Sequence, residues 1–365
     1  MSHPYNNKPS YTRWSRAVAA PEFSQVNPAV GFPFKLSQSD KVATAGSCFA
    51  QHIARRLKSN GFNYFVTEAG HELASPELCE QYNYGIFSAR YANIYTARQL
   101  VQLIERAYGD RTVADDHWVL EDGSFVDTLR PAIEPHGFTS LRELRADRAQ
   151  HLAEVRRMFE QLDYFVFTLG LTEAWMDSVD GTVFPVCPGV AGGTFDPERH
   201  QFRNFGVREV VDDLRIAIGR IRSVNPAARF ILTVSPVPLI ATAEDQHVLV
   251  STTYSKSVLR VACTEVINEF KDIVGYFPSY EIIMGSFNRG RYFADDLRSV
   301  MPEGVAHVMR IFMQTVSDGE YVAPAPRADA ADGTAERLER LQEMQRVVCE
   351  EELLELGRIS ADGAR

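Results

Sequence analysis

The stretch Lys41-Val42-Ala43-Thr44-Ala45-Gly46-Ser47-Cys48 runs from small and β-branched residues into a glycine. A short apolar run of this composition is typical of a buried strand. Residues 49–57 then place apolar side chains at helical spacing, and Asn60-Gly61 is a stop signal for that helix. This part of the chain therefore predicts a strand, a sharp glycine turn and a helix.

The same unit recurs along the chain. Continuous apolar runs predict further strands at 62–66, 164–169, 229–234 and 274–277. Helical spacing predicts helices at 95–107, 141–162, 207–221, 255–270 and 303–316. Because strands buried on both faces read as continuous apolar runs, we predict an α/β fold, a three-layer α/β/α sandwich with a mainly parallel five-stranded sheet.

The two ends of the chain differ from this body, which spans residues 39–317. Residues 1–38 hold several prolines and aromatic rings such as Tyr11, Trp14 and Phe23, which predicts an extended arm docked through its rings. Residues 318–334 read as a linker. Residues 335–365 read as a charged helical tail, which either folds back on the body or forms a homodimer.

Composition narrows the class of protein. The chain has 365 residues, 45% of them apolar and 24% charged, as in globular proteins. A net charge of −10 argues against a nucleic-acid partner or an anionic membrane surface, and most of this acidity falls in residues 318–365. No apolar run is long enough for a membrane span, and the N-terminus lacks the pattern of a secretory signal. We therefore expect a cytoplasmic protein.

Known cofactor and metal motifs are missing from the sequence. The five cysteines form no CxxC pair, and no glycine-rich nucleotide loop, P-loop or zincin motif occurs. We expect neither a cofactor nor a metal.

Polar residues follow the predicted strands at the edge of the sheet where ligands bind in this fold class. Ser47 and Cys48 stand at the N-terminus of the first helix, where free N–H groups and the helix dipole stabilise an oxyanion or thiolate. The alternative interpretation is that Ser47 is a plain helix cap. This exit is the best candidate for a nucleophile.

The motif Gly46-Ser47-Cys48-Phe49-Ala50 resembles the one that names the GSCFA-domain family, which is itself similar to the SGNH/GDSL ester hydrolases. Further shared motifs lie at 83–85, 90–96, 168–170, 234–237, 254–257 and 277–281. The resemblance extends over residues 1–317. It implies an SGNH-hydrolase-like fold and an ester hydrolase or O-acyltransferase, with a small-molecule or glycoconjugate ester as substrate.

The resemblance also implies site residues. Matching the glycine of the superfamily's Gly-Asp-Ser block assigns the nucleophile to Cys48, and a shift of one residue assigns it to Ser47. Gly85 matches the oxyanion-hole glycine, with Asn93 as a nearby amide donor. Thr172 stands where the superfamily has Asn, and Glu173 follows it.

The sequence does not identify which residue is the general base. SGNH enzymes end in Asp-x-x-His, whereas this chain reads Asp296-Leu297-Arg298-Ser299. A serine or cysteine nucleophile needs a base within hydrogen-bond reach, and His307, His247 and His52 are the candidates. Charged residues that are candidates for orienting a sugar or an anionic acyl group are Arg90, Lys256, Arg260 and Glu281. Because the expected histidine is replaced, a non-catalytic carbohydrate-binding module on the same fold is the alternative function.

Overall fold

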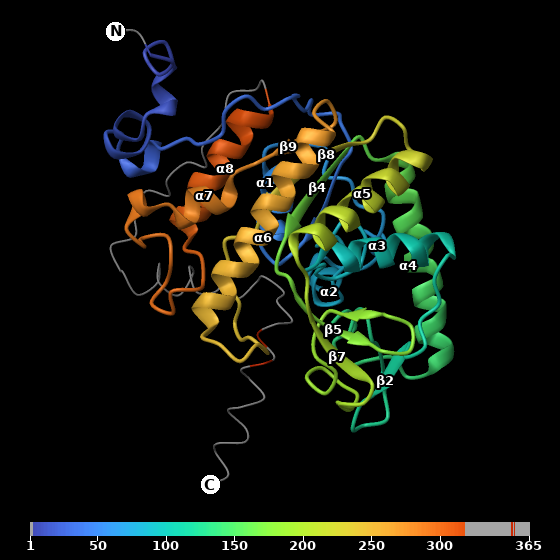
Figure 1. The fold of residues 1–365 in the computed structure, drawn as a ribbon. Helices are drawn as coiled ribbons and strands as arrows, with labels where there is room; N and C mark the ends of the chain where they lie inside the picture. Colours follow the sequence, from blue (N-terminus) through green and yellow to red (C-terminus); the bar gives the residue numbers. More distant parts are fainter. Residues whose placement is uncertain (1–2, 318–351, 353, 355–365) are drawn as a thin grey trace, which may run out of the picture.

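The central element is a four-stranded parallel sheet in a computed structural model that describes residues 3–317 together with 352 and 354. Its strand order is β1 (Val42–Gly46), β4 (Tyr164–Leu169), β8 (Arg229–Val234) and β9 (Val274–Tyr276) (Figure 1). These strands match four of the predicted ones. The predicted linker at 318–334 and almost all of the predicted tail helix lie outside the described residues.

The fifth predicted strand, at 62–66, does not form. Only Tyr64 bridges to β1, opposite Val42. Further along β1, the N–H of Thr44 donates to the hydroxyl of Ser88 at 3.0 Å instead of to a strand backbone. The prediction of a strand at 62–66 was therefore wrong. The hydroxyl of Ser88, from another part of the chain, accepts the hydrogen bond that a continuing fifth strand would have accepted from β1.

Helices connect the strands. Their bounds are α1 (Ala50–Ser59), α2 (Pro76–Gln81), α3 (Ala97–Tyr108), α4 (Leu141–Gln161), α5 (Val207–Val224), α6 (Val248–Glu269), α7 (Ser279–Met284) and α8 (Pro302–Val316). Their starts follow local chemistry: Thr96 and Gln99 form a capping box at α3, and Ser140 caps α4. The helix predicted from Ser255 begins earlier, at Val248, because the side chain of His247 accepts a hydrogen bond from its first turn.

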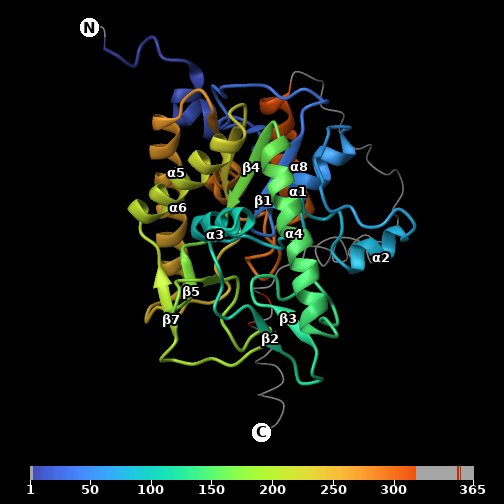
Figure 2. The ribbon, with the colours of Figure 1, turned by 90° about the vertical axis from the view of Figure 1, so that its right-hand side faces the viewer.

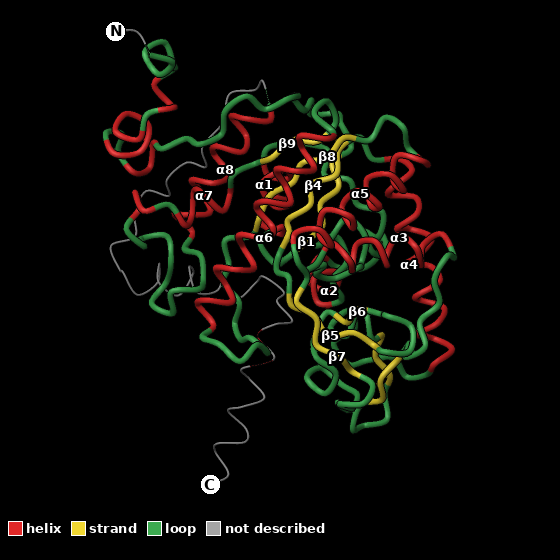
Figure 3. Tube along the Cα trace, viewed as in Figure 1, coloured by secondary structure: helices red, strands yellow, loops and turns green. Residues whose placement is uncertain are grey.

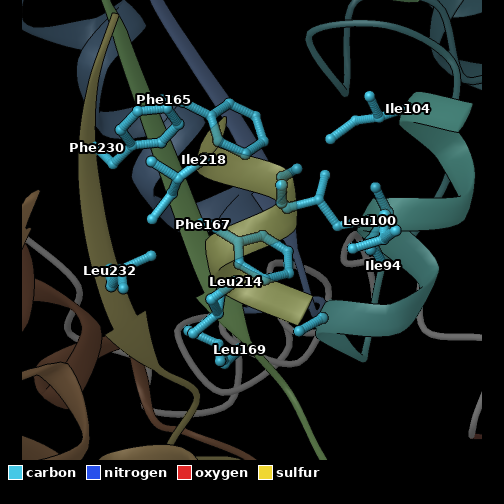
Figure 4. Packing of buried hydrophobic residues seen from close by; sticks show 14 of the residues in the cluster. Ile94, Leu100, Ile104, Phe165, Phe167, Leu169, Leu214, Ile218, Phe230 and Leu232 are labelled. Atoms are coloured by element: carbon cyan, nitrogen blue, oxygen red, sulfur yellow. The ribbon is translucent and has the colours of Figure 1, made fainter. Parts of the chain in front are cut away.

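The sheet separates two apolar cores. Phe165, Phe167 and Leu169 of β4 point into the first core, which α3, α4, α5 and α6 cover (Figure 4). Val166 of the same strand faces the second core, which α1, α7 and α8 cover. Each such fully buried side chain contributes about 1.5–3 kcal/mol, so burial on both faces explains the continuous apolar runs.

Smaller antiparallel elements lie beyond the carboxyl ends of the parallel strands (Figure 3). One sheet has the order β6 (Val183–Phe184), β5 (Glu173–Asp177) and β7 (His200–Asn204), and a hairpin joins β2 (His117–Val119) to β3 (Phe125–Asp127). Figure 2 shows α4 running from this region back along the sheet. These elements border the edge where a site is expected.

The N-terminal arm contains short helical turns at Ser10–Thr12, Ser15–Ala19 and Phe23–Gln25 (Figure 1). Tyr11 and Trp14 are exposed, so these rings do not dock, contrary to prediction. Phe23, the third predicted ring, does dock, with its centroid 5.9 Å from that of Tyr292, and Phe34 docks 5.3 Å from Tyr164. Within the described residues, the search found no helix that combines the length and apolarity needed to cross a membrane.

Candidate active site

Gly46 makes the turn that presents Ser47. Its φ is +135°, and a Cβ at this position would lie 2.2 Å from the carbonyl oxygen of Thr168 on the neighbouring strand. Only glycine fits here. The N–H of Ser47 donates to that same carbonyl oxygen at 3.0 Å, and the N–H of Ala50 donates to Ser47 O at 2.8 Å. Ser47 is thus fixed between the end of β1 and the start of α1.

The side chain of Ser47 is buried but uncommitted. The residue is 4% exposed, and its Oγ has no hydrogen-bond partner among the residues that the structure describes. Leaving a buried hydroxyl unpaired costs about 1–3 kcal/mol, so such groups in a folded protein call for an explanation. A hydroxyl kept available for reaction is one such explanation.

A small hollow adjoins Ser47, and residues that follow several strands line it. It is lined by Ser47, Cys48, Tyr95, Gly170, Leu171, Ser235, Val237, Pro238, Leu239 and Lys256. We call it the Ser47 pocket. It brings together both candidate nucleophiles and residues that follow β4 and β8, as expected for the carboxyl edge of a parallel sheet.

Lys256 on α6 supplies the amine of the Ser47 pocket. It is 2% exposed, and its Nζ donates to the carbonyl oxygen of Gly170 at 2.6 Å. A Cβ on Gly170 would lie 3.1 Å from the Cβ of Ser47, so this glycine allows the close approach of the two segments. The amine of a buried lysine is a general base in neutral form and stabilises an oxyanion when protonated.

The histidine expected on α8 does not line the Ser47 pocket. His307 Nδ1 lies 2.7 Å from the hydroxyl of Tyr292, and its Nε2 lies 3.0 Å from Val26 O. Burial, with the charge of Arg310, lowers the pKa of His307 to about 4. Both ring nitrogens therefore tie α8 to the arm and the loop before it.

The other base candidates also lie off the pocket lining. His247 is exposed, and its Nδ1 accepts from the N–H of Leu249 at 3.1 Å. The ring of His52 packs against Phe49 at 5.5 Å between centroids, and burial followed by the charge of Arg55 lowers the pKa of His52 to about 4.

Asp296 serves its own loop. It accepts from the hydroxyl of Ser299 at 2.5 Å and from the N–H groups of Arg298 and Ser299. Burial raises the pKa of Asp296, but these hydrogen bonds outweigh it and lower the pKa overall. The position of the superfamily histidine is thus occupied by a serine that closes a turn.

The oxyanion candidates Gly85 and Asn93 do not line the Ser47 pocket either. The N–H of Gly85 donates to Glu68 O at 3.1 Å. Asn93 Oδ1 accepts from Gln51 Nε2 at 3.3 Å, and Asn93 lines a second cavity.

Thr172 and Glu173 form hydrogen bonds with residues of β7 and of the loop before α6. Thr172 donates from Oγ1 to Asn204 Oδ1 at 2.7 Å, and Glu173 accepts from the hydroxyl of Thr242 at 2.7 Å. Burial raises the pKa of Glu173.

Arg90 lies in ion pairs with Glu134 and Asp147, at 2.5 and 2.9 Å. The last of the charged candidates, Arg260, pairs with Glu281 at 2.6 Å.

Sequence reasoning named Lys256 only as a substrate-orienting residue and missed that it shares a pocket with Ser47. The signal was present, because Lys256 stands among small and apolar residues at 255–259 of a helix. No group of three or more His, Cys, Asp or Glu side chains within the described residues is arranged to hold a metal ion.

These features define an α/β protein with a serine-cysteine turn at the carboxyl edge of a parallel sheet, facing a buried lysine. The model of the GSCFA family matches residues 41–312, and the chain belongs to the GSCFA family. A search of curated proteins found no match to the chain.

Proposed function

We propose that the protein is an ester hydrolase or O-acyltransferase that uses Ser47 as its nucleophile. The observation that carries this proposal is the buried, unpartnered Oγ of Ser47 in one pocket with Lys256. A carbohydrate or glycoconjugate as acyl carrier rests on the similarity to SGNH enzymes alone. The cores on both sheet faces support an SGNH-like three-layer arrangement.

In the proposed reaction, Ser47 Oγ attacks the ester carbonyl carbon while its proton passes to the neutral amine of Lys256. The resulting ammonium stabilises the tetrahedral oxyanion and then protonates the leaving alcohol as the ester C–O bond breaks. Water hydrolyses the acyl-serine, or a second alcohol takes the acyl group and completes a transfer. Each step balances with no reactant beyond ester, water and acceptor.

Cys48 is the alternative nucleophile, since it lines the same pocket and is 7% exposed. Its place just before α1 lets the helix N-terminus stabilise a thiolate. The two assignments differ in which single substitution removes the acyl-enzyme.

The test is turnover of p-nitrophenyl acetate together with labelling by an alkyl fluorophosphonate. We expect Ser47→Ala and Lys256→Met to lose turnover by about 100-fold or more, and Ser47→Ala to lose the label. Cys48→Ala and the exposed-surface control Lys271→Met should retain both. Loss in Cys48→Ala alone would move the nucleophile to Cys48, and equal turnover in every variant would refute the proposed site.

A non-catalytic binding module is the second candidate function. It is favoured by the absence of His52, His247 and His307 from the lining of the Ser47 pocket. Calorimetric binding of saccharides by a protein that turns over no ester would support it. A cytoplasmic location and a homodimer through residues 335–365 stay predictions.

A further inference from the structure

A second cavity lies among α3, α4 and the loops around β3 and β6. Its polar lining includes Gln99, Arg106, Arg130 and His151. It shares no lining residue with the Ser47 pocket. We call it the Arg106 cavity.

Arg106 is a buried cation, and the charge of Asp127 attracts it without a direct ion pair. It is 8% exposed, and its guanidinium makes no hydrogen bond or ion pair to any residue that the structure describes. Burial lowers the pKa of Arg106 to about 10, so the side chain keeps its charge at neutral pH. Arg130, in the same lining, pairs instead with Asp127 and Asp147 at 3.2 and 2.8 Å. The N–H groups of Arg106 therefore form an open donor set for an anion.

His151 adds an acceptor. It is fully buried, and its Nδ1 lies 2.7 Å from Glu68 Oε2. Burial, followed by the charge of Arg130, lowers the pKa of His151 to about 4, so the ring is neutral at pH 7. A carboxylate only accepts hydrogen bonds, so Nδ1 carries the proton and Nε2 is a bare acceptor. Nε2 has no partner among the described residues.

Gln99 is oriented for donation. Its Oε1 accepts from the N–H groups of Tyr95 and Thr96 at 3.0 and 2.9 Å. With the oxygen held by the backbone, the amide NH₂ is the remaining polar group of this side chain. The cavity thus combines a cationic fork, an amide donor and one neutral acceptor.

We propose that the Arg106 cavity binds a small oxyanion that carries one hydroxyl, such as a 2-hydroxycarboxylate or hydrogen phosphate. The guanidinium of Arg106 holds two anionic oxygens side by side, which a carboxylate or phosphate presents at matching spacing. The hydroxyl of the ligand donates to His151 Nε2. An anion without a hydroxyl leaves that buried acceptor unpaired, and this sets the specificity.

The experiment is calorimetric titration of the full chain with glycolate, acetate and inorganic phosphate. Glycolate and acetate differ by one hydroxyl, so glycolate should bind about tenfold more tightly, the effect of one buried hydrogen bond. Binding of glycolate without phosphate identifies a hydroxycarboxylate site, and the reverse result identifies a phosphate site.

Variants locate the site. Arg106→Gln should weaken binding by about tenfold or more, and His151→Phe should make glycolate and acetate equal. Arg142→Gln, on the exposed face of α4, is the matched control and should bind as the wild type does. Thermal melts report whether each variant folds.

The wild-type comparison keeps the proposal testable if a variant fails to fold. Measurable but equal affinity for glycolate and acetate, or binding of neither glycolate nor phosphate up to about 10 mM, would overturn the proposal and leave a hydrated cavity. Undiminished binding to a folded Arg106→Gln variant would overturn it as well. None of these outcomes depends on ester turnover.

Discussion

The Ser47 pocket and the Arg106 cavity both border segment 91–95, but they are built from different kinds of polar groups. The first gathers the hydroxyls of Ser47 and Ser235, the thiol of Cys48 and the backbone of Gly170 around one lysine. The second is backed by a network of buried ion pairs. In that network Asp127 pairs with Arg130 and with Arg148, at 3.2 and 3.0 Å.

The comparison of the two cavities separates side chains that stabilise the fold from side chains that are available for a reaction. Burial raises the pKa of Asp127, yet the surrounding arginines outweigh this and hold the pKa well below its usual range. These charges are committed to one another. Ser47 Oγ, by contrast, has no bond within the described residues to lose. Substitutions should therefore separate stability from activity.

The largest effect is expected from Arg130→Ala. This side chain is 1% exposed, and its removal takes one of two cationic partners from each of Asp127 and Asp147, which keep Arg148 and Arg90. Breaking a buried pair on one side destabilises by about 3–5 kcal/mol. The control is Arg215→Ala, which removes half-exposed pairs with Asp212 and Glu269 and should cost less than about 1 kcal/mol. Urea unfolding measures both, and similar losses would contradict the assignment of the network to the fold.

The Ser47 side of the comparison depends on one backbone position. Gly46→Ala places a methyl group 2.2 Å from Thr168 O at a φ of +135°, so we expect a loss of about 3 kcal/mol or more. Gly219→Ala is the matched control, because this glycine lies inside α5 with open space around it. It should stabilise the protein by about 0.5–1 kcal/mol. Opposite shifts in the melting temperature would confirm both.

Acid should weaken the Arg106 side through His151. The pKa of His151 is about 4 in the folded protein and near 6.5 when unfolded, so the unfolded chain binds the extra proton between these values. Its contribution to stability is complete above pH 6.5 and is lost as the pH falls toward 4. His151→Gln keeps a donor for Glu68 but does not titrate.

The variant should reduce the slope of unfolding free energy against pH by up to ~1.4 kcal/mol per pH unit between pH 6.5 and 4. Urea unfolding at stepped pH measures this slope. His247→Gln, at an exposed position, should leave it unchanged. A wild-type slope in His151→Gln would show that this ring does not contribute to acid sensitivity.

The parallel strands could be predicted because their sequence pattern is local. Residues 164–169 and 229–234 are buried on both faces, so each reads as an unbroken apolar run. The run at 62–66 has the same local pattern but does not form a strand. The reason is Ser88, whose hydroxyl accepts a hydrogen bond from the N–H of Thr44 on β1. The residues around 62 do not show that Ser88 lies there, so the local sequence could not predict this result.

In the candidate site, too, the residues set by local sequence could be predicted and those set by long-range contacts could not. Gly46 and Ser47 could be predicted because a glycine directly after a buried strand indicates a sharp turn, which the neighbouring residues alone reveal. Lys256 and Gly170 are far apart in the chain, and their contact follows from how α6 packs against β8 and β9. The His307 prediction relied on a superfamily pattern. The partners of this ring are Val26 of the N-terminal arm and Tyr292 of the loop before α8, and the pattern describes the position of neither.

The smallest change in stability is expected from Ser47→Ala, which removes a buried hydroxyl that has no partner among the described residues. The free energy of unfolding should stay within about 0.5 kcal/mol of the wild type or rise slightly, since an unpaired polar atom is lost. Ser279→Ala is the same chemical change at a fully buried position. There the hydroxyl lies 2.6 Å from Thr233 Oγ1 and donates to Val234 O at 2.9 Å, so its loss should cost about 1–2 kcal/mol. If urea unfolding gave equal losses for the two variants, Ser47 would be bonded in solution like an ordinary core serine, and its role as nucleophile would lose its structural support.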